Sequence, residues 1–347
     1  MKILHVVTSL AIGGVPRLLE SILPLQVDRN EITVLVYVRL NNDIESRLEQ
    51  AGIRIISLNE PKFRNPRVIF RMRKIFQDYD IVHSHLFPTL YWASLASRGL
   101  NVKMVYTEHS TSNSRRGRWY FRPLERFIYK RYDKIISISQ QTHDALTLWL
   151  EQDDARFVVV NNGVDTKKLA SVKMPIIPKS LIMVSRFAAS KDQETVIRAM
   201  KYIDKDATIS FVGDGENLEA CKKLAAETGV SDRVRFLGSC SDVPELISSS
   251  YIGIQSSKWE GFGLAAVEVM ACGKPIIATD VDGLKQIVIG AGEVFTTGNV
   301  LELAGLVNNL LADERCYNDM AERCKKRALE YDISLTSSDY LKLYDSL

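Results

Sequence analysis

The chain has 347 residues, of which 46% are hydrophobic and 25% are charged, a composition that excludes a disordered protein. Its length predicts two domains, because a single core seldom organises more than about 300 residues. The formal net charge of the chain is +3, of which residues 1–170 contribute +8 and residues 171–347 contribute −5. We therefore expect the first half to meet an anionic partner.

The N-terminus and the cysteines narrow the class of protein further. The opening residues MKILHVVTSL are too short and too polar for the apolar core of a signal peptide, and no later stretch approaches about 18 uninterrupted apolar residues. The five cysteines all lie beyond residue 220 and the five histidines all lie before residue 144, so neither a metal cluster nor a disulfide framework is expected. We expect a cytoplasmic protein without a metal centre.

Short apolar runs alternate with helix-length amphipathic stretches along the chain. The expected strands are 3–7, 32–38, 52–58, 80–85, 103–109 and 134–139 in the first half, and 180–187, 207–215, 233–238, 252–257 and 274–280 in the second. Parallel strands need crossover connections, so this alternation predicts parallel sheets with helices on both faces.

The strand series restarts after the polar, lysine-rich segment 163–180, which has the composition of a linker. The sequence therefore predicts an α/β fold with two Rossmann-like, doubly wound domains facing a central cleft. We place them at residues 1–165 and 166–330, followed by a helix in 331–347 that can return to the first domain. Ligands of such sheets bind beyond the carboxyl ends of the strands.

A glycine pair, Gly13-Gly14, stands between the first strand and a helix. At this place a backbone can approach a phosphate beside a helix N-terminus, although a tight turn is the alternative. The sequence AIGGVP lacks the GxGxxG spacing, and no ribose-binding acid follows the second strand. Both observations argue against an NAD-dependent dehydrogenase.

Two cations, Arg186 and Lys191, follow the strand at 180–187. At the tip of a strand they can converge on a diphosphate, Arg as a planar fork and Lys as a point charge. The alternative is a pair of solvated surface residues. The GDG sequence at 213–215 ends the next strand and is expected to form a turn, without an assigned contact.

The segment EGFGLAAVEVMA places Glu260 in a loop and Glu268 about one turn inside a helix over 264–271. The unpaired amides at the start of that helix favour an anion, and its small residues let a ligand lie against the backbone. Glu268 can accept hydrogen bonds from a diol such as a ribose, and Glu260 can do so for another hydroxylated ring. A capped helix with incidental acids does not account for this combination.

The pattern E-x7-E, from Glu260 to Glu268, resembles the signature of the retaining glycosyltransferases of family GT4, which have the GT-B fold. The other matching motifs are Gly13-Gly14, DIVHSH, TEH ending at His109, NNGVD at 161–165, the pair Arg186 and Lys191, and GDG. They span nearly the whole chain in the order typical of the family.

The resemblance implies that the first domain binds the acceptor and the second binds a nucleotide sugar. Arg186 and Lys191 would neutralise the diphosphate, and Glu268 would hold the ribose. The donor sugar would be held by Glu260 and by the amides of Phe262, Gly263 and Leu264. The glycine loop, through the backbone of Gly14, would approach the phosphate.

The resemblance also implies a reaction. His109 would lie beside the transferred sugar, and Ser84 and His85 would line the acceptor cleft. The expected catalytic residues are His109, Glu260, Arg186 and Lys191, without a protein nucleophile, metal or cofactor, because the two cations stabilise the leaving group. We expect retaining transfer from a UDP- or GDP-linked sugar to a hydroxyl, in surface polysaccharide or glycolipid synthesis. A sugar-nucleotide epimerase and a non-catalytic binding subunit are the alternatives.

Basic and aromatic residues alternate in RRGRWYFRPLERFIYKRY, residues 115–132. On a helix beginning near Pro123, Leu124 and Ile128 would share an apolar face. Such a segment suits an anionic membrane surface or a lipid-linked acceptor, which predicts peripheral association with the inner face of the cell membrane. No recognisable nucleic-acid module accompanies it, so nucleic acid is not an expected partner.

Overall fold

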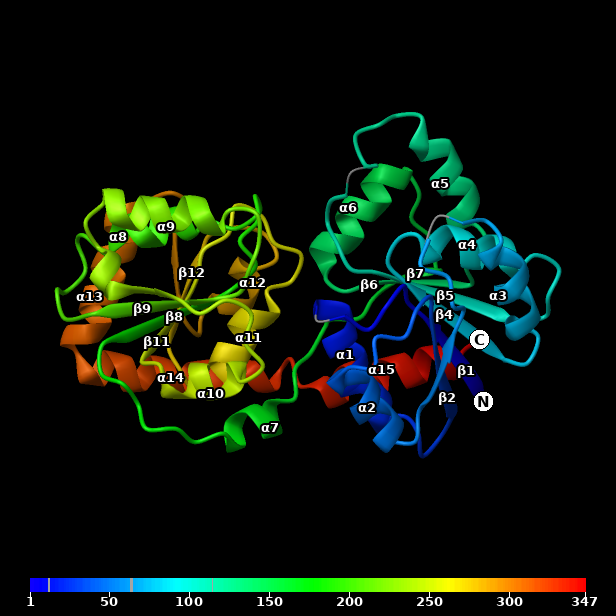
Figure 1. Ribbon diagram of the computed structural model, residues 1–347, viewed down its shortest axis with the longest axis horizontal. Coiled ribbons are helices and arrows are strands. Elements are labelled where there is room, and N and C mark those ends of the chain that lie inside the picture. Colours follow the sequence, from blue (N-terminus) through cyan, green and yellow to red (C-terminus); the bar gives the residue numbers. More distant parts are fainter. Residues whose placement is uncertain (12, 63–64, 114) are drawn as a thin grey trace. The chain divides into compact units, whose positions relative to one another are not determined.

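The computed structural model describes residues 1–11, 13–62, 65–113 and 115–347. These residues form two compact units, the first comprising 1–163 with 333–347 and the second comprising 164–332. Each unit is a parallel sheet with helices on both faces (Figure 1). The strand orders are β3-β2-β1-β4-β5-β6-β7 and β10-β9-β8-β11-β12-β13. The predicted class, α/β with two Rossmann-like sheets, is confirmed.

The first unit contains every strand that the sequence predicted for it, and one more. Its strands are β1 (Lys2–Val6), β2 (Glu31–Val36), β3 (Arg54–Ser57), β4 (Ile81–His85), β5 (Lys103–Glu108), β6 (Lys134–Ser137) and β7 (Phe157–Val159). Its helices are α1 (Gly14–Ile22), η1 (Leu23–Leu25), α2 (Asp43–Gln50), α3 (Val68–Phe76), α4 (Thr89–Ala96), α5 (Phe121–Tyr129), α6 (Gln140–Leu150) and α15 (Ile333–Asp345). The unpredicted strand β7 has three residues, too few for a recognisable pattern.

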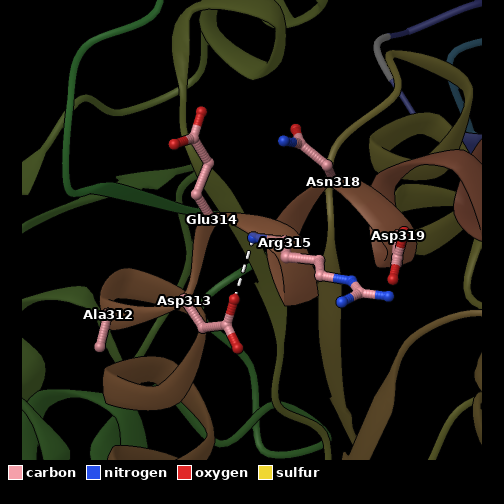
Figure 2. A pocket seen from close by; sticks show the side chains of 6 residues that line it. All are labelled: Ala312, Asp313, Glu314, Arg315, Asn318 and Asp319. Carbon is pink, nitrogen blue, oxygen red and sulfur yellow. Dashed lines mark hydrogen bonds between the residues drawn. The ribbon is translucent and has the colours of Figure 1, made fainter.

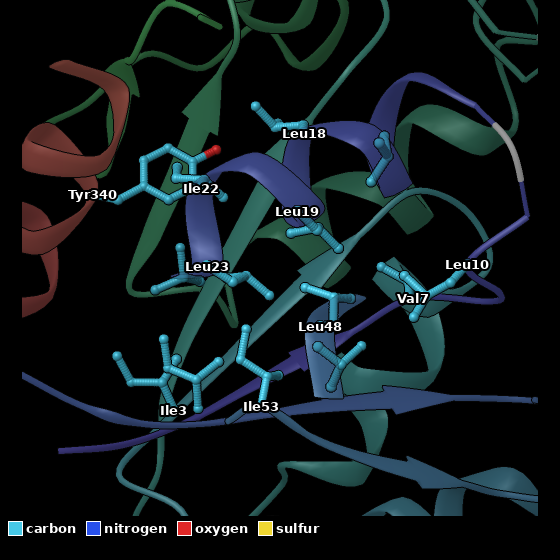
Figure 3. Packing of buried hydrophobic residues seen from close by; sticks show 14 of the residues in the cluster. Ile3, Val7, Leu10, Leu18, Leu19, Ile22, Leu23, Leu48, Ile53 and Tyr340 are labelled. Atoms are coloured by element: carbon cyan, nitrogen blue, oxygen red, sulfur yellow. The ribbon is translucent and has the colours of Figure 1, made fainter. Parts of the chain in front are cut away.

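Side-chain alternation divides the first unit into two hydrophobic layers. Ile3 of β1 packs with α1, α2 and α15, whereas its neighbour Leu4 packs with α3 to α6 on the opposite face. In the first layer Tyr340 of α15 lies with Ile22 of α1 (Figure 3). Each fully buried side chain of this size contributes roughly 1.5–3 kcal/mol. The last helix therefore completes the core of the first unit.

The second unit repeats the same architecture. Its strands are β8 (Ser180–Val184), β9 (Thr208–Val212), β10 (Val234–Phe236), β11 (Ile252–Gln255), β12 (Ile276–Thr279) and β13 (Glu293–Phe295). Its helices are α7 (Thr166–Ser171), α8 (Gln193–Ala199), α9 (Leu218–Glu227), η2 (Ser231–Arg233), α10 (Val243–Ser249), α11 (Leu264–Ala271), α12 (Lys285–Val288), α13 (Val300–Ala312) and α14 (Glu314–Leu329). Helices α8, α9 and α13 cover one face, and α10, α11 and α14 cover the other (Figure 1).

The segment 163–180 is not the structureless linker that its composition predicted. Residues 166–171 form α7, because the Asp165 side chain accepts a hydrogen bond from the Lys168 amide at 2.9 Å and caps the helix. The preceding backbone is also held, since the Val164 amide donates to the Tyr331 carbonyl at 2.9 Å. This stretch is part of the second unit.

Candidate functional site

The direction of strand succession reverses between β8 and β11 in the second sheet. Such a reversal opens a crevice at the carboxyl ends of the strands, where ligands of open α/β sheets bind. Arg186 and Lys191 follow β8, and Glu260 follows β11. The fold therefore brings residues from distant parts of the sequence to one edge of the sheet.

Lys191 and Glu260 form a close ion pair at this edge. The Lys191 ammonium donates to the Glu260 carboxylate and also to the Ser257 hydroxyl at 3.3 Å. The Lys191 and Glu260 side chains are 17% and 21% exposed. The Asp192 amide donates to the Ser256 carbonyl at 3.0 Å, which joins the two loops through their backbones. The two groups assigned to diphosphate and sugar thus neutralise each other in this structure.

Arg186 combines a fixed backbone with an exposed guanidinium. Its carbonyl accepts a hydrogen bond from the Gln193 side chain at 2.9 Å, and the following amide, of Phe187, donates to the Asp214 carbonyl at 3.0 Å. The Arg186 side chain is 79% exposed and lies 3.9 Å from Glu216. An ion pair this long and exposed is weak, so the guanidinium can turn to an anion.

Helix α11 begins beside Glu260 with Gly263 as its N-cap at φ +87°. No side chain of the described residues caps it, which leaves its first amides available. Phe262 is buried against Tyr331, with ring centroids 5.5 Å apart. Glu268, one turn into the helix, is partly buried. Burial of the Cys272 thiol, together with the negative charge of Glu268, raises the pKa of that thiol to about 12.

Two glycines near these residues are required by backbone packing. A Cβ atom at Gly213, where φ is +136°, would lie 2.1 Å from the Ser185 carbonyl oxygen. A Cβ atom at Gly283, where φ is +85°, would lie 2.4 Å from the carbonyl oxygen of Glu260. These glycines let neighbouring turns pack directly against the loops that carry Arg186 and Glu260.

The first sheet reverses in the same way between β1 and β4. The pair Gly13-Gly14 follows β1, with Gly13 in extended conformation at φ 174°. Among the described residues nothing lies within 4 Å of a Cβ atom placed on Gly14. Neither backbone conformation nor packing within the described chain therefore requires glycine at this turn.

Ser84 and His85, at the end of β4, are fully buried. The Ser84 hydroxyl lies 3.0 Å from the Tyr132 hydroxyl, and the His85 ring nitrogens contact His5 and His109. Neither side chain is exposed in this structure, and their place in an acceptor cleft stays a prediction. Their alternating positions in a strand covered on both faces explain the burial.

His109 follows β5 and is partly exposed. Its Nε2 atom lies 3.2 Å from Nδ1 of His85, and desolvation lowers its pKa to about 3. The ring is therefore neutral at pH 7. A neutral imidazole can orient a sugar through a hydrogen bond.

His5 and the tyrosines of the last helix contact the other histidines, which the sequence did not reveal. His5 and His83 are register partners on β1 and β4, and the hydroxyl of Tyr344 lies 2.6 Å from Nδ1 of His83. The signal was present in part, because His5, His83 and His85 occupy alternating positions of two predicted strands. The pairing of those strands was not visible in the sequence.

Most basic residues of the segment 115–132 form ion pairs with carboxylates of the same unit. Carboxylates hold four of its arginines: Glu125 holds Arg115, Glu108 holds Arg116, and Glu151 holds both Arg122 and Arg126. The expectation that Leu124 and Ile128 share one apolar face is wrong, because Ile128 is buried while Leu124 is exposed. Trp119, Tyr120, Leu124 and Phe127 of this segment are exposed, and these four side chains are together called the aromatic ridge. In the described ranges no helix is both long and apolar enough to cross a membrane.

A separate hollow of about 670 Å³ lies beside the start of α14 (Figure 2). It is lined by Ala312, Asp313, Glu314, Arg315, Asn318 and Asp319. The Asp313 carboxylate accepts hydrogen bonds from the Arg315 and Cys316 amides at 2.9 and 3.0 Å, so it serves as the cap of α14. No predicted site residue lines this hollow, and the Asp313 carboxylate has a structural use.

Comparison with known proteins gives two family matches. A family described as "Glycosyltransferase Family 4" matches residues 12–168, and one described as "Glycosyl transferases group 1" matches residues 171–330. The two matched ranges together span nearly the whole chain.

Individual relatives cover most of the chain at low identity. N-acetyl-alpha-D-glucosaminyl L-malate synthase of Bacillus anthracis is 29% identical over 275 residues, which are 73% of this chain and 71% of that protein. UDP-Gal:alpha-D-GlcNAc-diphosphoundecaprenol alpha-1,3-galactosyltransferase of Escherichia coli is 25% identical over 275 residues, 72% and 71% of the two chains. HepE from Anabaena, in complex with UDP and glucose, has a TM-score of 0.89 at 22% identity, with both chains fully covered.

Proposed function

Because the chain belongs to glycosyltransferase family 4, whose two parts match 12–168 and 171–330, we propose that it transfers a sugar with retention of configuration. The donor is a UDP- or GDP-linked sugar, and the acceptor is a hydroxyl. The observation that carries this proposal is the convergence of Arg186, Lys191 and Glu260 at the reversal point of the second sheet. HepE, which shares the fold, was crystallised with UDP and glucose, which favours UDP as the first nucleotide to test.

In the proposed donor complex the Lys191 and Glu260 pair exchanges partners. The diphosphate takes the Lys191 ammonium and the Arg186 guanidinium, which frees the Glu260 carboxylate to accept hydrogen bonds from sugar hydroxyls. The uncapped amides at Phe262, Gly263 and Leu264 donate to the same sugar. Glu268 accepts from the ribose hydroxyls. The ion pair thus keeps both groups satisfied until a ligand supplies better partners for each.

In the proposed reaction the acceptor oxygen bonds to the anomeric carbon as the bond from that carbon to the diphosphate oxygen breaks. Both events occur on the same face of the sugar, and the hydroxyl proton passes to the departing diphosphate. Arg186 and Lys191 stabilise the charge that develops there, so a metal ion is not needed. His109 orients the transferred sugar, and the backbone at Gly14 approaches the phosphate.

We place the acceptor in surface polysaccharide or glycolipid synthesis. Support comes from the E. coli relative, whose name specifies a lipid-linked diphosphate acceptor and an alpha linkage. The excess positive charge of residues 1–170 suits such an anionic acceptor.

The donor site is tested by calorimetric titration with UDP, GDP, ADP and NAD, in the presence of EDTA. Arg186→Ala and Glu268→Ala are each expected to weaken binding of the preferred nucleotide about 10- to 100-fold, because each removes charge-assisted hydrogen bonds worth roughly 1.5–3 kcal/mol. Arg198→Ala, which removes an exposed arginine of α8, is the matched control and should bind normally. Binding that survives both site substitutions would refute the assignment.

The reaction is tested by NMR with the nucleotide sugars of whichever nucleotide binds. A new glycoside whose anomeric configuration equals that of the donor supports retaining transfer. Interconversion of free nucleotide sugars would indicate the epimerase alternative, and binding without turnover for any hydroxyl acceptor would indicate the binding subunit. Equal rates with EDTA and with Mg²⁺ support metal independence.

We further propose that the aromatic ridge docks on an anionic membrane. Trp119 is 80% exposed and Phe127 is 51% exposed, and large aromatic rings favour the interface between lipid and water. Since most arginines of the segment are paired, the exposed Arg118 and Lys130 provide the attraction to anionic lipid.

Co-sedimentation with vesicles of phosphatidylglycerol and phosphatidylcholine tests this docking. The double variant Trp119→Ser/Phe127→Ser is expected to lose roughly 30-fold in partitioning, since each ring buries apolar area worth on the order of 1 kcal/mol or more. The control Phe70→Ser removes another exposed ring, on α3, which is 76% exposed. Equal binding of wild type to neutral and anionic vesicles would contradict the proposal.

A further inference from the structure

Four of the five histidines gather at the carboxyl edge of the first sheet. His5 on β1 and His85 on β4 are fully buried, and both face the layer covered by α1 and α15. His83 lies on the same face, in register with His5, and His109 follows the adjacent strand β5. Neutral imidazoles carry one N–H donor and one acceptor each, so a buried group of them must arrange its protons consistently.

Three of these rings, His5, His85 and His109, form a continuous histidine chain. Nδ1 of His5 lies 3.1 Å from Nε2 of His85, and Nδ1 of His85 lies 3.2 Å from Nε2 of His109. The His5 and His85 rings are nearly parallel, 13° apart, yet their centroids are separated by 5.4 Å. The rings therefore meet at their edges, nitrogen to nitrogen, as in-plane hydrogen bonds require.

His83 does not join this chain and does not complete a metal site. Ligand nitrogens of His5, His83 and His85 lie within 4.8 Å of one another. However, the His83 ring lies over the face of His85, with centroids 4.2 Å apart, and its nitrogens contact the Tyr344 and Thr107 hydroxyls at 2.6 and 2.7 Å. A shared metal needs in-plane lone pairs that converge on one point, and these stacked rings do not provide them.

The far end of the histidine chain determines which way its protons point. Nε2 of His5 is buried and has no hydrogen-bond partner among the described residues. If His109 donated to His85 and His85 to His5, this orphan nitrogen would carry a hydrogen. In the opposite direction it carries only a lone pair. Orphaned buried N–H groups are rarer in proteins than orphaned acceptors, so the second direction is favoured.

We propose that His5 and His85 are positioning residues that lock His109 into the tautomer protonated at Nδ1. In this arrangement Nδ1 of His5 donates to His85, and Nδ1 of His85 donates to Nε2 of His109. Nδ1–H of His109 is then a fixed donor, and no described residue accepts a hydrogen bond from it. The role of this donor rests on the proposed function, in which His109 holds a hydroxyl or ring oxygen of the transferred sugar.

The electrostatics agree with a neutral chain. Burial lowers the pKa of His5 to about 3 and that of His85 well below its ordinary value, and neighbouring histidines add to the effect at His85. At pH 7 each neutral ring therefore carries one N–H proton, which resides on either Nδ1 or Nε2. The Nδ1–H form is the less common tautomer of free histidine, so its presence in all three rings is a specific expectation.

The tautomers are tested directly by two-bond ¹H–¹⁵N correlation spectra of the full-length protein, deuterated and labelled at histidine, at pH 7. We expect His5, His85 and His109 to show a protonated Nδ1 and a bare Nε2. Single substitutions of each histidine assign the signals. A proton on Nε2 of His109, a charged ring, or stoichiometric zinc that displaces these signals would overturn the proposal. This readout is independent of glycosyl transfer.

Activity then tests whether the tautomer matters. His85→Leu removes the donor to His109, and we expect the Nδ1–H signal of His109 to give way to the Nε2–H form. The turnover number kcat should fall about 10-fold, the worth of one hydrogen bond, while KM for the donor changes less than about twofold. His85→Asn places an amide donor at the position of Nδ1 and should restore both the signal and most of the rate.

The possible outcomes separate the two proposals. If the tautomers are as expected but His85→Leu turns over at the wild-type rate, the positioning role is refuted while the glycosyltransferase assignment stands. If no variant or wild type transfers sugar to any acceptor, the proposed function fails while the spectra still decide the tautomer. Should His85→Leu fail to fold, the wild-type spectra alone remain decisive.

Discussion

Lowering the pH from 7 to 5.5 is expected to destabilise the first compact unit by about 4 kcal/mol, a large part of a typical domain's stability. The cause is the burial of His5, His83 and His85, whose pKa values desolvation depresses in the folded state. In the unfolded chain each has a pKa near 6.5. At these three fully buried rings the unfolded state therefore binds about three more protons as the pH falls below about 6.5, and each contributes about 1.4 kcal/mol per pH unit. The partly exposed His109, whose pKa is also lowered, adds to the loss. Stability is fully present above that pH and is lost as the pH falls toward the folded values.

Urea denaturation in a Trp259→Phe background measures this effect, because the remaining tryptophans, Trp92, Trp119 and Trp149, all lie in the first unit. The free energy of unfolding should decrease by about 4 kcal/mol between pH 7 and 5.5. His143→Asn is the control, since His143 lies on α6 beside Asp153 and outside the cluster, and it should preserve the pH dependence. A free energy that stays constant over this range would show that the buried histidines do not resist protonation.

The fold was predictable because its signals are local and repeated. Every predicted strand appears, since each is a run of apolar residues long enough to be distinguished from its flanking helices. The missed strands, β7 and β13, have three residues each, whereas the equally short β10 lies within the longer predicted run 233–238. Helix α7 was missed for a different reason, because its lysine-rich composition concealed the capping signal at Asp165.

The candidate site also contains some features that depend on local sequence and others that depend on contacts between distant residues. Glu260 and Glu268, the proposed donor-binding carboxylates, could be selected from the sequence because they lie in one short segment whose pattern is informative by itself. The ion pair between Lys191 and Glu260 joins residues 69 positions apart, and the contact from His5 to His85 spans 80 positions. Such contacts depend on which strands are neighbours, and the order β2-β1-β4 becomes known only with the structure.

Burial was the least predictable property of the site residues. Ser84 and His85 were assigned to an acceptor cleft from the resemblance to family GT4. Their side chains point into the two covered faces of the sheet, where Tyr132 and His5 receive them. Position along the strand was correctly predicted, but the depth of each side chain depends on the length of the helices and loops above it.

Gly213→Ala and Gly14→Ala are expected to differ in their effect on stability, although both replace a glycine by alanine. At Gly213 the new methyl group would lie 2.1 Å from the Ser185 carbonyl oxygen, with φ at +136°. The clash and the backbone strain together should destabilise the second unit by about 3 kcal/mol or more. At Gly14, the first residue of α1, nothing in the described chain opposes the methyl group, so thermal stability should be unchanged or slightly higher.

Nucleotide binding should show the reverse order of sensitivity. Because the proposed role of Gly14 is to let a phosphate approach its backbone, Gly14→Ala should weaken binding of the donor sugar nucleotide about 10-fold or more, without loss of fold. Gly305→Ala is the matched control, because that glycine lies within α13 and a methyl group there also meets nothing in the described residues. Thermal denaturation and calorimetry on the three variants separate the two kinds of glycine. Normal affinity in Gly14→Ala would mean that the first glycine loop does not approach the donor, and the site would then be confined to the residues of the second unit.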